Sequence, residues 1–448
     1  MRKGVSAAAA LCLLVFFCPP VASPEMFDLE SVIIFALKHN PSLRIAEKNV
    51  AIERSGVESA KAERMPKVDF GSGATRYRYP LPLTPIFLPS TLSFSTLANL
   101  QIPDFERTIY DAGASFRLPL YRGGRIAGNI RIAETREALA KENYRASQQD
   151  LVFNLTSVFH KILQLQRLLA ANEASVKQLE DHRRNAELFL KAGTAPRLDV
   201  LKAEVDLAHG RDNLLLVRNN LESTLELLKD LMGIEEAGAA ITITAPPASE
   251  AALQSREEDI RTALSRRPDY LAISKKKAIQ EDRIRVAWGK WLPDIYGSGQ
   301  YIKKGGDGTS FPEDWFLGLR LTIPVFDGGL IRQEVDREKA ELEKVRQEER
   351  AMRLSIFREV KDAHLGIANA SDRIGVAEKA IESARETARV ERLKYETGAA
   401  TGTDVIDSQA ALLRSEADYY QALYDREIAF AARRKATGES EWAKEVLR

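Results

Sequence analysis

Residues 315–329, WFLGLRLTIPVFDGG, change character twice within one short stretch, and the same change occurs at residues 110–124, YDAGASFRLPLYRGG. Each stretch begins with apolar residues that alternate with polar or small ones, the pattern of a β-strand with one apolar face. A proline and a glycine pair follow, and a long run of strong helix formers begins after Gly124 and after Gly329. The sequence therefore predicts, twice, a strand that turns into a helix.

The two stretches belong to a duplication that covers most of the chain. The offset of 205 residues that relates them also relates Gly193 to Gly398. Nearer the N-terminus the offset is 227, as between Pro41 and Pro268, so the first copy carries 22 additional residues. They lie around the proline-rich run YPLPLTPIFLPS (79–90), which we interpret as a loop insertion. We accordingly expect a first structural repeat at 24–233, an inter-repeat linker at 234–254, a second repeat at 255–438 and a C-terminal tail at 439–448.

Proline-free runs of about 68 residues follow each glycine pair, at 125–192 and 330–397. A continuous helix of that length is ~100 Å long at 1.5 Å per residue, which is longer than a compact domain accommodates. Apolar residues recur at spacings of three and four, as in a coiled coil. Each run stops at a glycine, and a second helix is expected after it, at 199–232 and 404–437. The pattern predicts two helical hairpins.

Shorter helices are expected ahead of the strands, within 28–65 and 255–291, each interrupted at an internal proline. The second of them opens with SREE, in which Ser255 and Glu258 have the spacing of a capping box. Each short helix leads into a strand-like segment, so each repeat has the same order of elements.

The strands of both repeats carry one apolar face. In the second repeat this face consists of Trp315, Leu317, Leu319, Leu321 and Ile323. In the first repeat it consists of Tyr110, Ala112, Ala114, Phe116 and Leu118. An apolar face that begins with an aromatic residue is typical of a transmembrane barrel strand, with Tyr110 and Trp315 as an interfacial girdle, although a half-buried soluble strand alternates in the same way. Four strands are too few to close a barrel, so a membrane location requires several copies of the chain.

The N-terminus predicts export from the cytosol. Residues 1–23 combine a basic start, an apolar stretch and small residues, as in a secretory signal peptide. Both cysteines, Cys12 and Cys18, lie within it, so disulfides and thiolate metal sites are excluded from the remainder. The chain has 65 Lys and Arg against 64 Asp and Glu, and this balance gives no indication of a nucleic-acid partner. After the leader there is no apolar run of the ~18 residues that a membrane helix needs.

This ordered set of features resembles the TolC-like outer-membrane efflux protein family over essentially the whole chain after the leader. The resemblance implies a mainly α-helical fold with membrane β-structure. Long helical hairpins would form a periplasmic α-barrel, and four strands per chain would contribute to a 12-stranded outer-membrane β-barrel in a homotrimer. It also implies that a periplasmic adaptor contacts the hairpin tips and links the channel to an inner-membrane transporter of the RND or ABC class.

Two acids follow the tip of the second hairpin in GTDVID, Asp404 and Asp407. The resemblance implies that they line the closed aperture of the channel, where a threefold assembly would give a ring of six carboxylates. Helix capping alone also explains them, because Asp is a favoured N-cap and an acid in the first turn interacts well with the helix dipole. In the first repeat Asp199 matches Asp404, but Lys202 matches Asp407. Ala400 stands where the best-studied family members carry a basic residue, so an arginine-based lock is not expected.

The hairpin tips, KAGTAPR and ETGAATGT, are small and nearly uncharged. Any tight turn between helices favours such residues, and the resemblance additionally implies contact with the adaptor. The residues expected at this contact are Gly193, Thr194, Ala195, Pro196, Asp199, Gly398, Ala399, Ala400 and Thr401.

The function that these observations predict is transport rather than catalysis. An enzymatic carboxylate pair needs a pocket and partner residues, and a hairpin tip supplies neither. The five histidines are scattered without ligand spacing, so we expect neither a metal site nor a cofactor. We expect the outer-membrane channel of a tripartite efflux or type I secretion system, a passive duct. The alternative is a periplasmic structural or adaptor coiled-coil protein that never enters a membrane.

Overall fold

The computed structural model describes residues 25–83, 104–235, 241–244, 254–308 and 311–439. The expected leader with both cysteines lies outside the described residues, as do most of the proline-rich loop, most of the linker and nearly all of the expected tail. None of the helices in the described ranges is both long enough and apolar enough to cross a lipid bilayer.

The chain divides into two compact units, and each unit draws segments from both sequence repeats. The hairpin unit is formed within residues 1–40, 154–251 and 373–424. The sheet unit is formed within residues 41–153, 252–372 and 425–448. The long helices α4 (Arg125–Lys191) and α8 (Leu330–Glu396), of 67 residues each, continue from one unit into the other. Two uninterrupted long helices are therefore confirmed.

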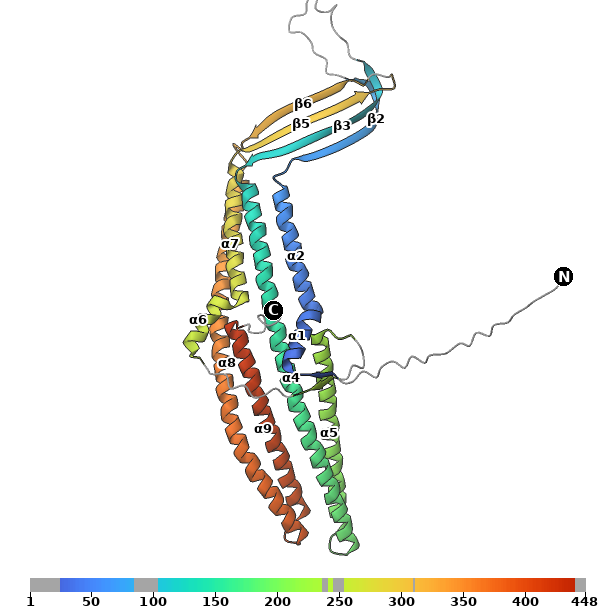
Figure 1. The fold of residues 1–448 in the computed structure, drawn as a ribbon, viewed down its shortest axis with the longest axis vertical. Coiled ribbons are helices and arrows are strands. Elements are labelled where there is room, and N and C mark those ends of the chain that lie inside the picture. Colours follow the sequence, from blue (N-terminus) through green and yellow to red (C-terminus); the bar gives the residue numbers. More distant parts are fainter. Residues whose placement is uncertain (1–24, 84–103, 236–240, 245–253, 309–310, 440–448) are drawn as a thin grey trace, which may run out of the picture. The chain divides into compact units, whose positions relative to one another are not determined.

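The sheet unit contains a four-stranded antiparallel sheet (Figure 1). Its strands are β2 (Lys67–Pro82), β3 (Phe105–Arg122), β5 (Asp294–Gly305) and β6 (Glu313–Thr322). They lie in the order β2-β3-β5-β6, so the strand hairpin of one repeat pairs with that of the other through β3 and β5. The two predicted strand hairpins are confirmed, and they join into a single sheet.

A glycine pair makes each turn from strand to helix. Gly123 and Gly124 have φ angles of 58° and 74°, and Gly328 and Gly329 have φ angles of 69° and 88°. Side chains other than glycine rarely adopt this left-handed region. At Gly123 there is also no room, because a Cβ there would collide with the carbonyl oxygen of Gly289. The predicted junction of strand, turn and helix is confirmed in both repeats.

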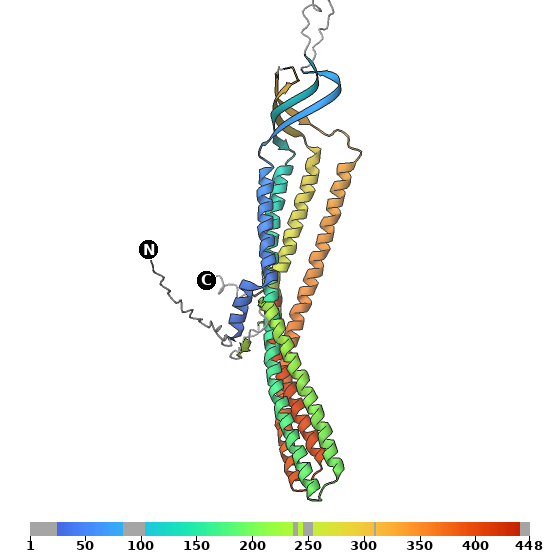
Figure 2. The ribbon, with the colours of Figure 1, turned by 90° about the vertical axis from the view of Figure 1, so that its right-hand side faces the viewer.

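The shorter helices of the sheet unit begin where the sequence provides a start signal. They are α2 (Pro41–Ala62), α6 (Arg256–Arg266) and α7 (Pro268–Trp288), and α7 continues into a 3-10 turn, η1 (Gly289–Trp291). Pro41 and Pro268 are each the first residue of a helix, and the capping box of Ser255 and Glu258 opens α6 as predicted. Figure 2 shows the helices of this unit following one another in the order α2, α4, α7 and α8.

A buried ionic cluster fastens the C-terminal end of α9 (Gly402–Thr437) within the sheet unit. Arg433 donates from Nε and Nη2 to the two carboxylate oxygens of Asp259, at 2.6 and 2.7 Å. The ring nitrogen Nε2 of His364 lies 2.8 Å from the same carboxylate, which is fully buried. Such a bidentate pair combines charge with fixed geometry, so it holds α6, α8 and α9 in register. Four buried apolar residues of the same three helices form a core cluster: Ala263, Ile356, Val360 and Ala436.

The hairpin unit contains α1 (Leu29–His39), α5 (Arg197–Met232) and parts of α4, α8 and α9. Its most deeply buried side chains include Leu155, Phe159 and Ile162 of α4, in line with the predicted apolar stripe. At the other end of α5, Asn40 donates from Nδ2 to the carbonyl oxygen of Leu231 at 2.9 Å. The predicted helical hairpin of the first repeat is thereby anchored to α1.

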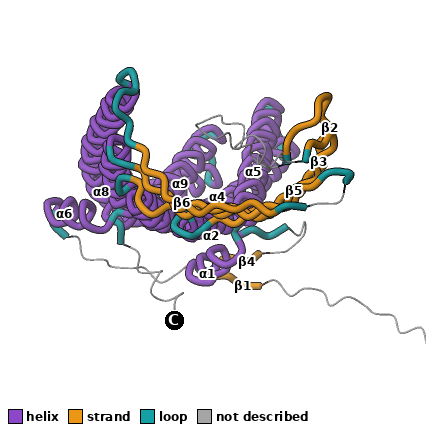
Figure 3. Tube along the Cα trace, turned by 90° about the horizontal axis from the view of Figure 1, so that it is seen from above, coloured by secondary structure: helices purple, strands orange, loops and turns teal. Residues whose placement is uncertain are grey.

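A small parallel sheet in the hairpin unit was not predicted. It pairs β1 (Glu25–Phe27) with β4 (Ile241–Ile243), and Figure 3 shows the two strands side by side next to α1. Strands of three residues are too short to produce a periodic sequence pattern. The N-terminal segment is thus tied to the region between the two repeats.

Candidate functional site

One side of the four-stranded sheet is a continuous exposed apolar surface, which we call the apolar face. The strand register places four residues in one row across the sheet: Phe70, Ala114, Tyr301 and Trp315. The next row consists of Val68, Phe116, Gly299 and Leu317. Trp315, Leu317 and Leu319 are 68%, 73% and 76% exposed. Soluble monomers rarely leave an apolar surface of this extent open to water, so the face marks a contact with lipid or protein.

The opposite side of the sheet is mostly polar. One of its rows contains Lys67, Arg117 and Ser298, and the next contains Asp69, Ser115 and Gln300, with Phe316 as an apolar exception at its end. The two sides therefore differ in chemistry across paired strands, and the predicted alternation is confirmed. A half-buried soluble sheet would cover its apolar side with helices, whereas this apolar side is exposed.

The two predicted girdle residues lie on the apolar face. Tyr110 of β3 is paired with Gly305, and its hydroxyl donates to Asp307 Oδ1 at 3.3 Å. Trp315 of β6 is paired with Tyr301, which donates from its hydroxyl to Glu313 Oε2 at 2.8 Å. Sequence reasoning missed Tyr301, because β5 is rich in glycine and its alternation is weak. The pairing thus adds a third aromatic residue with a polar tip to this face.

The sheet has two open edges. Within the described residues, β2 pairs only with β3, and β6 pairs only with β5. The outer backbone N–H and C=O groups of both edges are therefore available to further strands.

The predicted aperture acid Asp404 lies in the first turn of α9, where it takes part in capping the helix, as the alternative interpretation expected. The N-cap is Thr401, not Asp404. The backbone N–H and the hydroxyl of Thr401 donate to Asp404 Oδ2 at 2.8 and 2.7 Å, and Asp404 N–H donates back to Thr401 Oγ1 at 3.3 Å. This is a reciprocal capping box in which the acid is the third helical residue. The hydrogen bond from the hydroxyl of Thr401 lowers the pKa of Asp404, and the hydrogen bond from the backbone N–H of Thr401 adds a smaller lowering.

The second predicted aperture acid, Asp407, is exposed one turn further along α9 and has no hydrogen bond or ion pair within the described part of the chain. The corresponding position in the first repeat, Lys202, is exposed as well. Asp199 lies in the first turn of α5, whose N-cap Pro196 makes no side-chain capping bond. Of Asp199, Asp404 and Asp407, only Asp404 therefore has a side chain that takes part in a capping box within the described residues.

Both hairpin tips are tight turns that end a helix at a left-handed glycine. Gly193 and Gly398 have φ angles of 74° and 77°. The next N–H groups reach back into the preceding helix, from Thr194 to the carbonyl of Phe189 at 2.9 Å and from Ala399 to that of Lys394 at 2.8 Å. This is the Schellman pattern of helix termination. The tip residues predicted to contact an adaptor are exposed or half-exposed, so their side chains are open to a partner.

Aromatic contacts join α4 to α8 within the hairpin unit, close to the tips. The ring centroid of Tyr395 lies 5.6 Å from that of Phe189 in an edge-on arrangement, and 5.0 Å from that of His182. A Cβ at Gly402 would lie 3.1 Å from the His182 ring, so the start of α9 also packs there. Sequence reasoning missed this cluster, because no local pattern indicates that residues more than 200 positions apart meet.

His182 is a buried titratable group in this cluster. Burial lowers the pKa of His182, and the negative charges of Asp206 and Asp199 partly oppose that shift. The neutral imidazole is therefore the form that fits between α4, α8 and α9.

Comparison with known proteins decides the family. A family model described as "Outer membrane efflux protein" matches residues 32–234 and 260–439. The chain belongs to the outer membrane efflux protein family. It is similar to outer membrane protein TolC of Vibrio cholerae serotype O1, with 24% identity over 74% of this chain and 77% of that protein. It is also similar to outer membrane efflux protein BepC of Brucella suis, with 22% identity over 92% of this chain and 85% of that protein.

A solved structure shows the same fold. The Campylobacter jejuni CmeC outer membrane channel superposes with a TM-score of 0.78 at 17% identity, covering 94% of this chain and 88% of that one. The resemblance to TolC-like proteins and the mainly helical fold with four antiparallel strands are thus confirmed.

As an outer membrane efflux protein, the chain is a channel component and not an enzyme, and it belongs to the outer membrane with its helical part in the periplasm. Within the ranges that the structure describes, no group of three or more His, Cys, Asp or Glu side chains could hold a metal ion. The exposed apolar face of the sheet agrees with the outer-membrane location.

Proposed function

We propose that the chain is the outer-membrane channel of a tripartite efflux or type I secretion system, a passive export duct built as a homotrimer. One observation carries the proposal: a single sheet with a continuous exposed apolar face and two open edges. Three copies supply twelve strands, enough to close a barrel in which every edge strand is paired. Closure satisfies the backbone groups that lipid cannot. The apolar face then contacts lipid, and the polar face lines water.

Tyr110 and Trp315 are proposed as girdle residues at one membrane interface. Aromatic rings with a polar tip are enriched where lipid headgroups meet the hydrocarbon. The hydroxyl of Tyr110 is already engaged by Asp307, which supports a position at the polar boundary. Tyr301, paired with Trp315, extends the same girdle.

The hairpin tips are proposed to dock to a periplasmic adaptor, which links the channel to an inner-membrane RND or ABC transporter. Their small, uncharged side chains support the proposal, because such residues permit close packing against partner helices. The contact would use the turns at residues 193–196 and 398–401, together with Asp199.

Asp404 and Asp407 are proposed to line the aperture at the periplasmic end of the duct. A threefold assembly would bring six carboxylates together there. Thr401 orients Asp404, whereas Asp407 has no partner among the described residues, so Asp407 is the better candidate for contact with a passing cation. Ala400 carries no charge that could hold the aperture closed. The ring contacts of Tyr395 with Phe189 and His182 support the proposal that aromatic packing holds it closed instead.

Cross-linking between the open edges tests the proposed trimer. Gly71 on β2 and Gly318 on β6 both have open space for a Cβ, and the described residues contain no cysteine. The double variant Gly71→Cys with Gly318→Cys, treated in membranes with a short bis-maleimide, is expected to give covalent dimers and trimers. Each single variant is the control and is expected to stay monomeric on a denaturing gel. Cross-linking that stops at dimers, or none at all, would contradict closure by the two edges.

The family match and the outer-membrane location argue against the alternative of a periplasmic coiled-coil protein, and membrane extraction tests the difference directly. A protein held by the apolar face needs detergent for its release, whereas a periplasmic protein is released by high salt.

A further inference from the structure

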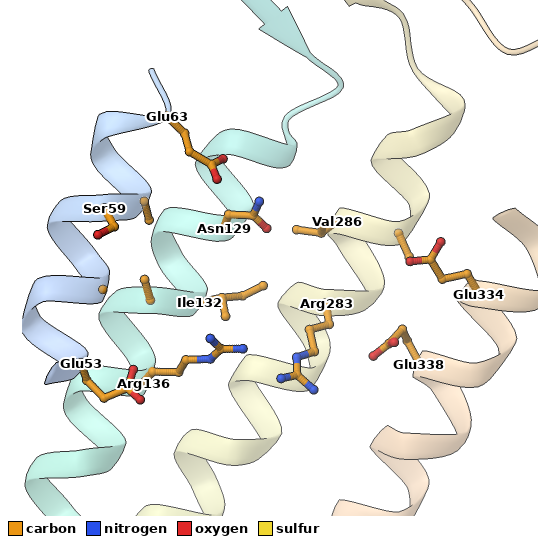
Figure 4. Close-up of a pocket in the computed structure, with 14 residues that line it drawn as sticks. Glu53, Ser59, Glu63, Asn129, Ile132, Arg136, Arg283, Val286, Glu334 and Glu338 are labelled. Atoms are coloured by element: carbon orange, nitrogen blue, oxygen red, sulfur yellow. The ribbon is translucent and has the colours of Figure 1, made fainter. Parts of the chain in front are cut away.

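Two adjoining cavities lie among α2, α4, α7 and α8 in the sheet unit, with volumes of about 420 and 630 Å³. Figure 4 shows the smaller one, into which Arg136 extends from α4 and Arg283 from α7. Both arginines and Glu53 also line the larger cavity, where Lys276 of α7 adds a third cation. We call the larger cavity the arginine groove.

None of the three cations of the arginine groove makes an ion pair within the described residues, although the charge of Arg283 contributes to lowering the pKa of Glu338 in the smaller cavity. Arg136 and Lys276 make no ion pair among the described residues, and the one polar contact of Arg283 is from Nη1 to Gln280 Oε1 at 3.4 Å. All three side chains are exposed. An unpaired guanidinium is a ready partner for a carboxylate, sulfonate or phosphate, because its planar donors match two oxygens at once.

The acids of the arginine groove do not balance these cations. Glu341 lies 3.3 Å from Lys344 Nζ, outside the lining of the groove. Glu53 is then the one acid of the lining without an ion pair in the described residues. The groove therefore has an excess of positive charge, although the whole chain is close to neutral.

Two neighbouring arginines on the same helices share one buried carboxylate. Asp282 of α7 is buried, and it accepts from Nε of Arg131 at 3.1 Å and from Nη2 of Arg285 at 2.6 Å. Both lie within a few positions of Arg136 or Arg283. Asp282 therefore holds these two arginines, whereas Arg136 and Arg283 have no carboxylate within ion-pair distance among the described residues.

The rest of the arginine groove is apolar with a few amide groups. Its apolar wall is formed by Ile52, Leu139, Ile279 and Val345, and its amides include Asn49 and Asn143. A ligand that matches both parts carries an anionic group on an apolar body. We propose that the arginine groove binds small amphiphilic organic anions, which contact it on their way through the duct; this passage rests on the proposed function, whereas the binding itself does not.

Equilibrium dialysis of the full chain in lipid nanodiscs tests the proposal, with 1-naphthalenesulfonate as the probe. Arg136→Gln with Arg283→Gln is expected to weaken its binding by at least about tenfold, because two charge-assisted hydrogen bonds are lost. Lys48→Gln with Arg54→Gln is the matched control. It removes the same charge from exposed positions of α2 that line neither cavity, and it is expected to bind as the wild type does.

Three results would contradict anion binding in the arginine groove. They are equal binding by the arginine variant, equal loss in the control, and equally tight binding of a naphthyl trimethylammonium cation. Bilayer conductance of the same samples separates this inference from the channel. If the arginine variant alone loses binding and the protein forms no pores, the proposed anion site is supported and the proposed channel is contradicted. If the protein forms pores but the arginine variant binds as the control does, the channel is supported and the anion site is contradicted.

Discussion

At the two hairpin tips, one residue decides how the next helix begins. Thr401 supplies both an N–H and a hydroxyl to Asp404, and so closes a capping box. The matching position in the first repeat is Pro196, which has neither group and makes no side-chain capping bond. Asp199 and Asp404 occupy equivalent positions, but only the carboxylate of Asp404 is held by the capping residue before it. Asp407, which has no partner in the described residues, is the most available of the acids at these tips.

Replacing Asp407 is expected to change the block of the channel by multivalent cations. Asp407→Asn should raise the blocking concentration of a trivalent cation by about tenfold, since it removes three carboxylates from one ring of a trimer. Asp404→Asn should have a smaller effect, because that carboxylate is held by Thr401. Single-channel recording measures both, with Asp199→Asn in the first tip as the control. Unchanged block in the Asp404→Asn, Asp407→Asn double variant would refute the carboxylate ring.

His182 is expected to make the packing near the tips sensitive to pH. Its pKa is lowered in the folded protein, so the unfolded state binds the proton more readily. The stabilising effect is complete above the ordinary His pKa of about 6.5 and is lost as the pH falls below it. Hydrogen exchange in α4 and α8 near the tips should therefore be faster at pH 5.5 than at pH 7.5, after correction for intrinsic rates. His182→Gln should remove that difference, whereas His209→Gln, at an exposed site, should retain it.

At the scale of single elements, the features that could be predicted from the sequence are those that depend on local signals. The long helices followed from proline-free runs, and α6 followed from its capping box at Ser255. The start of α9 was misassigned by a few residues, because Thr401 and Asp404 are both favourable capping residues and only their geometry assigns the roles. The pairing of β1 with β4 and the contact between Tyr395 and His182 join distant segments. No local pattern contains that information.

The glycine turns offer a matched pair of substitutions at the element scale. Gly328→Ala should cost about 1–2 kcal/mol, the penalty of a left-handed backbone for an alanine, because its surroundings are open. Gly123→Ala should cost at least about 1 kcal/mol more, since its Cβ would also collide with Gly289. Urea unfolding in detergent compares the free energies of unfolding. Equal losses for the two variants would show that the approach of Gly289 is not a constraint.

At the scale of the whole molecule, the chemistry of the sheet and its topology point the same way. The sheet has an apolar face, a polar face and two edge strands that each lack a second partner among the described residues. Further copies of the same sheet would supply those partners. The sequence predicted the faces from alternation, but not the pairing of β3 with β5 that makes them continuous. Membership of the outer membrane efflux protein family is consistent with this requirement for assembly.

Planar-bilayer recording of the detergent-extracted full chain tests the central claim most directly. The protein is expected to insert as discrete conducting units, whose current is reduced by multivalent cations added on the side of the hairpin tips. An oligomer that is intact in detergent and yet produces no conductance steps, under conditions in which a reference porin inserts, would contradict the claim that this chain forms an export channel.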